Sequence, residues 1–93
     1  MIHSFRDSDT ESVFQRRRVG KFSNELQRQA QRKLGILNSA IDLNDLRAPP
    51  GNRLERLVGD RQGQHSIRVN DQWRICFSWI SGDAWNVELT DYH

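Results

Sequence analysis

The sequence contains few cysteines and histidines, the residues that form disulfide bonds and bind metals. Its single cysteine, Cys76, cannot form an internal disulfide, and its histidines, at positions 3, 65 and 93, occur at no spacing typical of a zinc site. No apolar run approaches the roughly 18 residues that a membrane-spanning helix needs. Residues 1–10 contain no apolar segment of the signal-peptide type. We therefore expect a cytoplasmic protein without an internal disulfide or a metal site.

The length and composition are those of one small globular domain. The chain has 93 residues, of which 35% are apolar and 28% charged. A chain of this size buries only about two-thirds of the surface that its unfolded form exposes. We expect a single domain over residues 1–93 with a small hydrophobic core.

Positive charge is concentrated in one stretch and comes mostly from arginine. The sequence has twelve arginines and two lysines, and residues 14–34 contain seven basic residues against one acid. These basic residues are Arg16, Arg17, Arg18, Lys21, Arg28, Arg32 and Lys33. Arginine holds phosphate or carboxylate groups by two hydrogen bonds, which favours a surface for a polyanion or an acidic partner. A solvated helix face is an equally good interpretation.

The first half of the sequence predicts a short strand and two helices. We expect a strand at residues 2–5, and the Ser8–Glu11 capping-box pattern predicts a helix from about Asp9. A longer helix is predicted from about Ser23, because apolar residues follow at intervals of three and four. These apolar residues are Phe22, Leu26, Ala30, Leu34, Leu37 and Ile41.

The second half of the sequence predicts a β-sheet. Consecutive prolines predict a loop at residues 48–52. Strands are predicted at residues 54–58, 65–69, 73–80 and 85–89, where apolar residues alternate or cluster between turn residues. The expected fold class is therefore α+β: a strand and then two helices packed on a mainly antiparallel sheet of about four to five strands.

The hairpin loops predict which residues face each other. A three-residue loop at residues 70–72 places Arg68 opposite Arg74, and a loop at residues 81–83 pairs Trp79 with Trp85, Phe77 with Val87 and Ile75 with Leu89. Two opposed arginines repel unless an anion lies between them. For Arg74, neutralisation by Glu88 on the next strand is an equally good alternative. For Arg68, no neighbouring-strand acid is so well placed, which favours phosphate binding.

The sheet region resembles a known family. The matching segments are Pro49–Glu55, Gly59–Arg61, Ser66–Phe77 and Asp91–His93. Together with the capping-box start and Arg32–Leu34, they are similar to HigB toxins of the RelE/ParE superfamily. This resemblance implies a RelE-like microbial RNase fold and a ribosome-dependent mRNA endonuclease that inhibits translation. It also implies a HigA antitoxin with a helix-turn-helix DNA-binding domain, and neither cofactor nor metal.

Metal-free RNA cleavage requires a base, an acid and positive charge beside the phosphate. The proton-handling candidates are Asp91, Tyr92 and His93, and the phosphate-binding candidates are Arg68, Arg74 and, more weakly, Arg53. The basic residues Arg16, Arg17, Arg18, Arg28, Arg32 and Lys33 are the candidates for ribosome docking. His65 and Cys76 are predicted to pack within the sheet.

Two other functions compete with mRNA cleavage. One is a ParE-like inhibitor that binds DNA gyrase without chemistry, and the other is a basic RNA-binding module without toxicity. The Asp91–His93 segment with Arg68 favours cleavage, because a pure binder needs no proton-transfer group beside a phosphate clamp. Codon preference is not predicted by the sequence.

Overall fold

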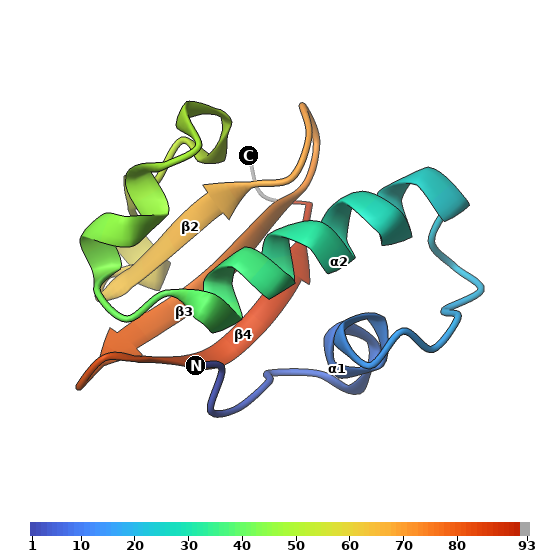
Figure 1. Ribbon diagram of the computed structural model, residues 1–93, viewed down its shortest axis with the longest axis horizontal. Coiled ribbons are helices and arrows are strands. Elements are labelled where there is room, and N and C mark those ends of the chain that lie inside the picture. The colour runs from blue at the N-terminus through green and yellow to red at the C-terminus, as the bar shows by residue number, and fades with distance from the viewer. Residues whose placement is uncertain (92–93) are drawn as a thin grey trace.

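A computed structural model describes residues 1–91 as two α-helices packed on a four-stranded antiparallel sheet of order β1-β2-β3-β4. Figure 1 shows α2 lying across one face of the sheet, with α1 beside it. This arrangement confirms the predicted α+β fold class. The helices are α1 (Ser8–Phe14) and α2 (Asn24–Ser39), and the strands are β1 (Glu55–Arg56), β2 (Gln64–Arg68), β3 (Arg74–Ile80) and β4 (Asp83–Thr90).

The long helix follows the predicted apolar spacing. The Ser23 hydroxyl caps it by accepting a hydrogen bond from the Leu26 amide at 3.1 Å. The predicted apolar residues within the helix are buried, but Ile41 is 83% exposed because the helix ends at Ser39. Within residues 1–91, no helix has the length and apolar character needed to span a bilayer.

The N-terminal segment differs from its prediction in two details. The cap of α1 is Asp7, whose carboxylate accepts from the Thr10 amide at 2.7 Å, and not Ser8. The helix starts one residue earlier because an aspartate caps at least as well as a serine. Residues 2–5 form two isolated parallel bridges to β4, at Ala84 and Val87, in place of a continuous strand.

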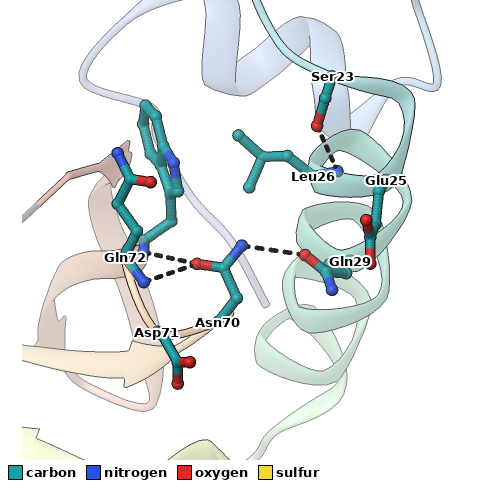
Figure 2. Close-up of a pocket in the computed structure, with 8 residues that line it drawn as sticks. Ser23, Glu25, Leu26, Gln29, Asn70, Asp71 and Gln72 are labelled. Carbon is teal, nitrogen blue, oxygen red and sulfur yellow. Dashed lines mark hydrogen bonds between the residues drawn. The ribbon is translucent and has the colours of Figure 1, made fainter.

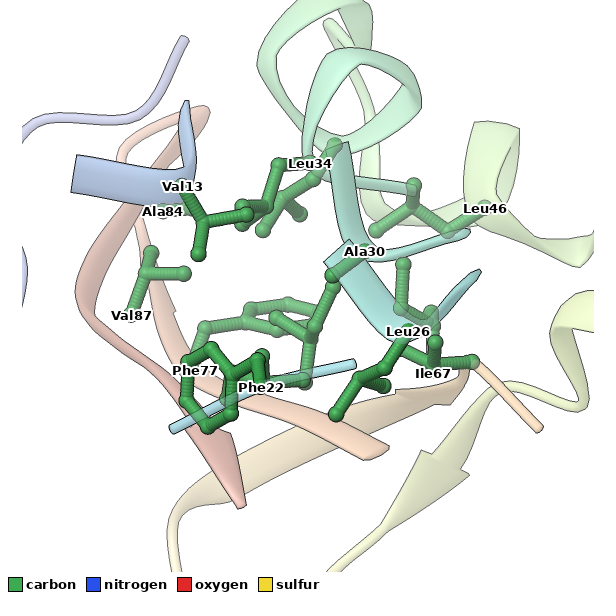
Figure 3. Close-up of a cluster of buried hydrophobic side chains, with 14 of the residues drawn as sticks. Val13, Phe22, Leu26, Ala30, Leu34, Leu46, Ile67, Phe77, Ala84 and Val87 are labelled. Carbon is green, nitrogen blue, oxygen red and sulfur yellow. The ribbon is translucent and has the colours of Figure 1, made fainter. Parts of the chain in front are cut away.

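The hydrophobic core lies between α2 and the covered face of the sheet (Figure 3). Leu34 and Leu37 of α2 are fully buried, as are Ile67 of β2 and Phe77 of β3. Val13 brings α1 into the same cluster, and Leu46 joins it from the short 3-10 helix η1 (Leu43–Arg47). The core thus ties both helices and the loop after α2 to the sheet.

The segment before β2 is less regular than predicted. The expected strand at residues 54–58 shortens to Glu55–Arg56, and the expected loop contains the 3-10 helix η2 (Pro50–Asn52). A second short helix, η3 (Gly59–Arg61), occupies the predicted turn before β2. Backbone hydrogen bonds within these short helices, such as those from the amides of Arg53 and Gln62 to the carbonyls of Pro50 and Gly59, satisfy backbone groups outside the short strand.

The first hairpin has the predicted register, and the second has it in part. Arg68 faces Arg74 and Ile67 faces Ile75, as the three-residue loop requires. Between β3 and β4, Ile75 faces Leu89 as predicted, but Trp79 faces Ala84. The predicted pairing of Trp79 with Trp85 is therefore wrong.

A two-residue turn and a bulge explain the changed register. Ser81 and Gly82 both have left-handed backbone conformations, with φ of 52° and 84°, which is the pattern of the tight hairpin turn whose twist matches the strands. The register then shifts by one residue between Cys76 and Ser78, and Asn86 on β4 has φ of 53°. One extra residue on β4 at this bulge shifts the register back, so that Ile75 still faces Leu89 despite the two-residue turn.

Candidate active site

Arg68 and Arg74 lie side by side at the end of the sheet where β2 turns into β3. They face each other in the strand register, and both line a shallow pocket of about 390 Å³. The other residues that line it are Arg53, Glu55, Asn70, Asp71 and Gln72. The pocket therefore gathers the three arginines that the sequence predicted to bind phosphate.

Arg74 is held by hydrogen bonds from its guanidinium group. Its Nε donates to the Ser66 hydroxyl at 2.7 Å, and its Nη2 donates to the Arg53 carbonyl at 2.6 Å. Glu55 lies 3.8 Å away and supplies the negative charge. Glu88 instead pairs with Arg61 at 3.0 Å and Arg6 at 3.9 Å, so the prediction that Glu88 could neutralise Arg74 is wrong. The register alone did not show that Arg61 reaches Glu88 from η3.

Arg68, unlike Arg74, pairs with a carboxylate that a bound phosphate could displace. Its Nη2 forms an ion pair with the Asp71 carboxylate, which is fully exposed on the hairpin loop. An exposed ion pair of this kind contributes little to stability, typically about 0–1 kcal/mol. A phosphate can replace Asp71 at small cost, and a bidentate contact with phosphate is the stronger interaction.

Strand pairing brings the end of β4 to the arginine pocket. Thr90 faces Arg74 in the sheet, and the next residue, Asp91, accepts a hydrogen bond from the Gln72 side chain at 2.9 Å. Asp91 is therefore within the same neighbourhood as the pocket. The other two proton-handling candidates, Tyr92 and His93, lie outside the described residues.

Asn70 holds the hairpin loop that carries Asp71 and Gln72, through hydrogen bonds within the loop and one to α2 (Figure 2). The side-chain Oδ1 of Asn70 accepts hydrogen bonds from the backbone amides of Gln72 and Trp73 at 2.8 Å, and its Nδ2 donates to the Gln29 side chain at 3.0 Å. A second pocket, of about 360 Å³, lies between this loop and the start of α2. The sequence analysis did not identify Asn70 or Gln72 as site residues, although an asparagine opening a hairpin loop is a known turn signal.

The docking candidates divide into exposed and anchored side chains. Arg16, Arg17, Arg28 and Arg32 are exposed. Arg18 is exposed as well, but its guanidinium donates to the carbonyls of Val19 at 2.5 Å and Phe22 at 2.6 Å, and to the Gln27 side chain at 2.8 Å. Its guanidinium therefore braces the connection between the two helices.

Lys33 of α2 is anchored too, by a contact with the residue before Arg53. Its Nζ donates to the Asn52 side chain at 2.5 Å. Burial, and then repulsion from Arg32 and Arg68, lower the pKa of Lys33 below its ordinary value of 10.5. Lys33 thus feels the charge of Arg68 in the pocket as well as that of Arg32 on its own helix.

His65 and Cys76 pack as predicted. His65 is half-buried, with its ring 6.1 Å from that of Phe77. Burial, followed by repulsion from Arg56, lowers the pKa of His65. Cys76 is buried, and burial raises the pKa of its thiol. Among residues 1–91, no three His, Cys, Asp or Glu side chains are grouped closely enough to hold a metal ion.

Two of the curated proteins similar to this chain carry the name HigB. Toxin HigB-1 of Vibrio cholerae is 53% identical over 58 residues, which is 62% of this chain and 61% of that toxin. Endoribonuclease HigB of Proteus vulgaris is 30% identical over 93 residues and matches all of both chains. An uncharacterized protein of Haemophilus influenzae is 35% identical over 69 residues, covering 74% of this chain and 68% of that protein.

The solved structures and the family model agree with this resemblance. Two structures of the YoeB–YefM complex from Staphylococcus aureus match with TM-scores of 0.61 and 0.62 at 14% identity, covering 100% of this chain and 98% of theirs. At that identity they confirm the fold alone. Residues 3–93 match the model for HigB-like toxins, described as the RelE-like toxin HigB of type II toxin–antitoxin systems. The chain therefore belongs to the HigB-like family of RelE-like type II toxins.

Proposed function

We propose that the protein is an endoribonuclease toxin that cleaves mRNA on the ribosome, in the cytoplasm, and so inhibits translation. The observation that supports this most is the pocket in which Arg68 faces Arg74 beside the chain segment that carries Asp91. The relative from Proteus vulgaris is named an endoribonuclease. The family to which this chain belongs consists of toxins from toxin–antitoxin systems, so the expected partner of this chain is an antitoxin. We propose that this antitoxin is a HigA-like protein with a helix-turn-helix domain.

The pocket residues suit cleavage by the ribose 2′-hydroxyl. In this reaction the 2′-oxygen bonds to phosphorus and loses its proton to a base, while the 5′-oxygen leaves and gains a proton from an acid. The products are a 2′,3′-cyclic phosphate and a free 5′-hydroxyl. Arg68 and Arg74 stabilise the extra negative charge at phosphorus. Asp91, Tyr92 and His93 are the proposed proton-transfer groups, with His93 suited to either role near neutral pH.

The ribosome supplies what a domain of this size lacks. The arginine pocket, of about 390 Å³, has room for a phosphate group but not for a length of RNA. The alignment of the 2′-oxygen with the leaving oxygen therefore has to come from mRNA held in the ribosomal A site. Exposed arginines on α2 and before it, including Arg28 and Arg17, are the proposed contacts to ribosomal RNA.

The proposed function is tested by comparing three substrates. Purified protein is incubated with mRNA on ribosomes, with the same mRNA free in solution, and with supercoiled DNA and gyrase. We expect cleavage only on the ribosome, with cyclic phosphate ends. Efficient cleavage of free mRNA at defined codons contradicts the ribosome dependence. Inhibition of gyrase without any RNA cleavage would instead support a ParE-like binder.

The substitution His93→Gln tests the proton-transfer assignment. We expect it to lower the cleavage rate by about 10²–10⁴-fold, the usual contribution of a general acid or base, with little change in thermal midpoint. The measurements are a single-turnover rate on ribosomes and a thermal melt. A rate within a few-fold of the parent would transfer the role to Tyr92, Asp91 or a ribosomal group.

A further inference from the structure

Asn52 is a fully buried polar side chain directly before Arg53 of the arginine pocket. It has no exposed surface, and its amide oxygen accepts from Lys33 Nζ at 2.5 Å. Its amide nitrogen donates to the carbonyls of Leu46 at 3.2 Å and Ala48 at 3.1 Å. One side chain thus joins α2, η1 and η2. A buried amide that uses both its oxygen and its nitrogen in this way has one orientation.

The backbone leads directly from Asn52 to the pocket. The Asn52 amide bonds to the Pro49 carbonyl at 2.9 Å, and the Arg53 amide bonds to the Pro50 carbonyl at 3.2 Å. Arg53 then adopts a left-handed conformation, with φ of 44° and ψ of 59°, and its carbonyl accepts from Arg74 Nη2 at 2.6 Å. L-residues rarely adopt this conformation, and it persists only where surrounding contacts hold it.

Lys33 secures Asn52 from the helix side. The lysine is half-buried and donates to a neutral amide rather than to a carboxylate. The contact therefore orients Asn52 without neutralising the lysine charge, and Lys33 remains an added cation beside Arg68. A continuous series of contacts connects α2 with the guanidinium of Arg74.

We propose that Asn52 is a positioning residue for cleavage: supported by Lys33, it sets the backbone of Arg53, whose carbonyl holds the Arg74 guanidinium in the pocket. The part of this proposal that concerns cleavage rests on the proposed function. The geometric part does not, because the Arg53–Arg74 contact exists with or without a substrate.

A double-mutant cycle tests whether Asn52 acts through Arg74. The single-turnover cleavage rate on saturating ribosomes is measured for the parent, Asn52→Ala, Arg74→Ala and the double variant. A displacement of about 1 Å at a reacting group costs up to roughly 100-fold, so we expect Asn52→Ala to lower the rate roughly 10- to 100-fold with little change in ribosome affinity. In the Arg74→Ala background it should cost nothing more. An equal loss in both backgrounds would overturn the proposal.

Gln27 offers a matched control. Its side chain is 5% exposed and makes three hydrogen bonds, to the Arg17 carbonyl, the Val19 amide and the Arg18 guanidinium. We expect Gln27→Ala to lower the thermal midpoint about as much as Asn52→Ala, while the rate on saturating ribosomes, measured below both midpoints, stays near that of the parent. A similar rate loss in both variants would mean that lost stability alone explains the effect.

A spectroscopic measurement separates this proposal from the proposed function. In the free protein, NMR follows the exchange of the Arg74 guanidinium protons with water. We expect Asn52→Ala to speed their exchange, and Lys33→Met to do so to a smaller extent, because the Arg53 carbonyl is then less well placed. Unchanged exchange in Asn52→Ala overturns the positioning role, whether or not the parent cleaves RNA. If exchange quickens but the parent cleaves no RNA, the geometric part stands and the proposed function fails.

Discussion

Two arginines that the strand register places opposite each other have different surroundings. Arg74 has side-chain and backbone acceptors on β2 and before β1, and 12% of its side chain is exposed. Arg68 has the exposed Asp71 as its ion-pair partner. A fixed cation beside an exchangeable one suits a site that must admit a phosphate and then stabilise it more strongly in the transition state.

Replacing Arg68 should impair chemistry more than binding. We expect Arg68→Ala to lower the single-turnover cleavage rate by about 10²-fold, because one charged donor to the phosphorane is lost. Ribosome affinity, measured by sedimentation, should change little. Asp71→Asn is the matched control, since it removes the partner of Arg68 but keeps the guanidinium, and its rate should stay within a few-fold of the parent. Equal losses in both variants would mean that the ion pair itself is needed.

His65 predicts a pH dependence of stability. Because burial and Arg56 lower its pKa in the folded state, the unfolded chain binds more protons than the folded one as pH falls below about 6.5. The free energy of unfolding should therefore rise with pH through this window and level off above it. In His65→Gln the rise should be smaller, as measured by urea unfolding between pH 5 and 7.5. Parallel curves for the two proteins would contradict this assignment.

At the scale of elements, the two hairpins show how loop geometry sets a sheet. The β2–β3 loop has three residues and keeps the predicted register throughout. The β3–β4 turn has two left-handed residues, and the bulge near Asn86 corrects the resulting offset. The two-residue turn places Trp79 opposite Ala84, so the two tryptophans do not face each other: Trp79 packs against Phe77, while Trp85 stacks on His3 at 3.9 Å.

The bulge predicts a specific sensitivity at Asn86. A left-handed residue with a branched β-carbon is sterically strained, so we expect Asn86→Val to lower the free energy of unfolding by about 1–2 kcal/mol. Asn86→Gly should stay close to the parent, because glycine adopts this conformation without strain. The free energy of unfolding is measured by urea denaturation, and the m-value should be the same for all three proteins. No difference between valine and glycine would mean that the backbone at Asn86 is not left-handed in solution.

At the scale of the whole molecule, the distribution of charge matters more than the net charge of +2. The arginine pocket lies at the hairpin end of the sheet, while exposed arginines lie on α2 and on the connection before it. We expect these arginines to bind the ribosome and the pocket to act on the mRNA.

Charge reversal tests this division of labour. We expect Arg16→Glu with Arg17→Glu to weaken ribosome binding roughly 10- to 100-fold near 50 mM salt, and less near 200 mM, because the contacts are ionic. The single-turnover rate at saturation should persist. Arg47→Glu with Arg56→Glu is the control, since it changes the net charge equally on exposed residues of η1 and β1. Equal weakening by both pairs would indicate a nonspecific effect of charge.

The resemblance of the sheet-region segments predicted the family, which the family model confirms. The fold class, the long helix and the first hairpin register were predictable from the sequence as well, and the structure confirms them. These three features depend on local spacing: apolar periodicity, the helix start near Ser23 and the loop length between Arg68 and Arg74. The functional roles of Arg53, Arg68, Arg74, Asp91, Tyr92 and His93 remain predictions.

The pairing of side chains that are distant in sequence became visible only in the folded chain. Arg61 rather than Arg74 binds Glu88, Arg18 braces a loop, and Lys33 meets Asn52 across 19 residues. No periodic pattern predicts such pairs, because each depends on where irregular turns place two long or buried side chains in space. The burial of Asn52 beside the arginine pocket follows from the path of η1 and η2, and that path is set by packing against the core.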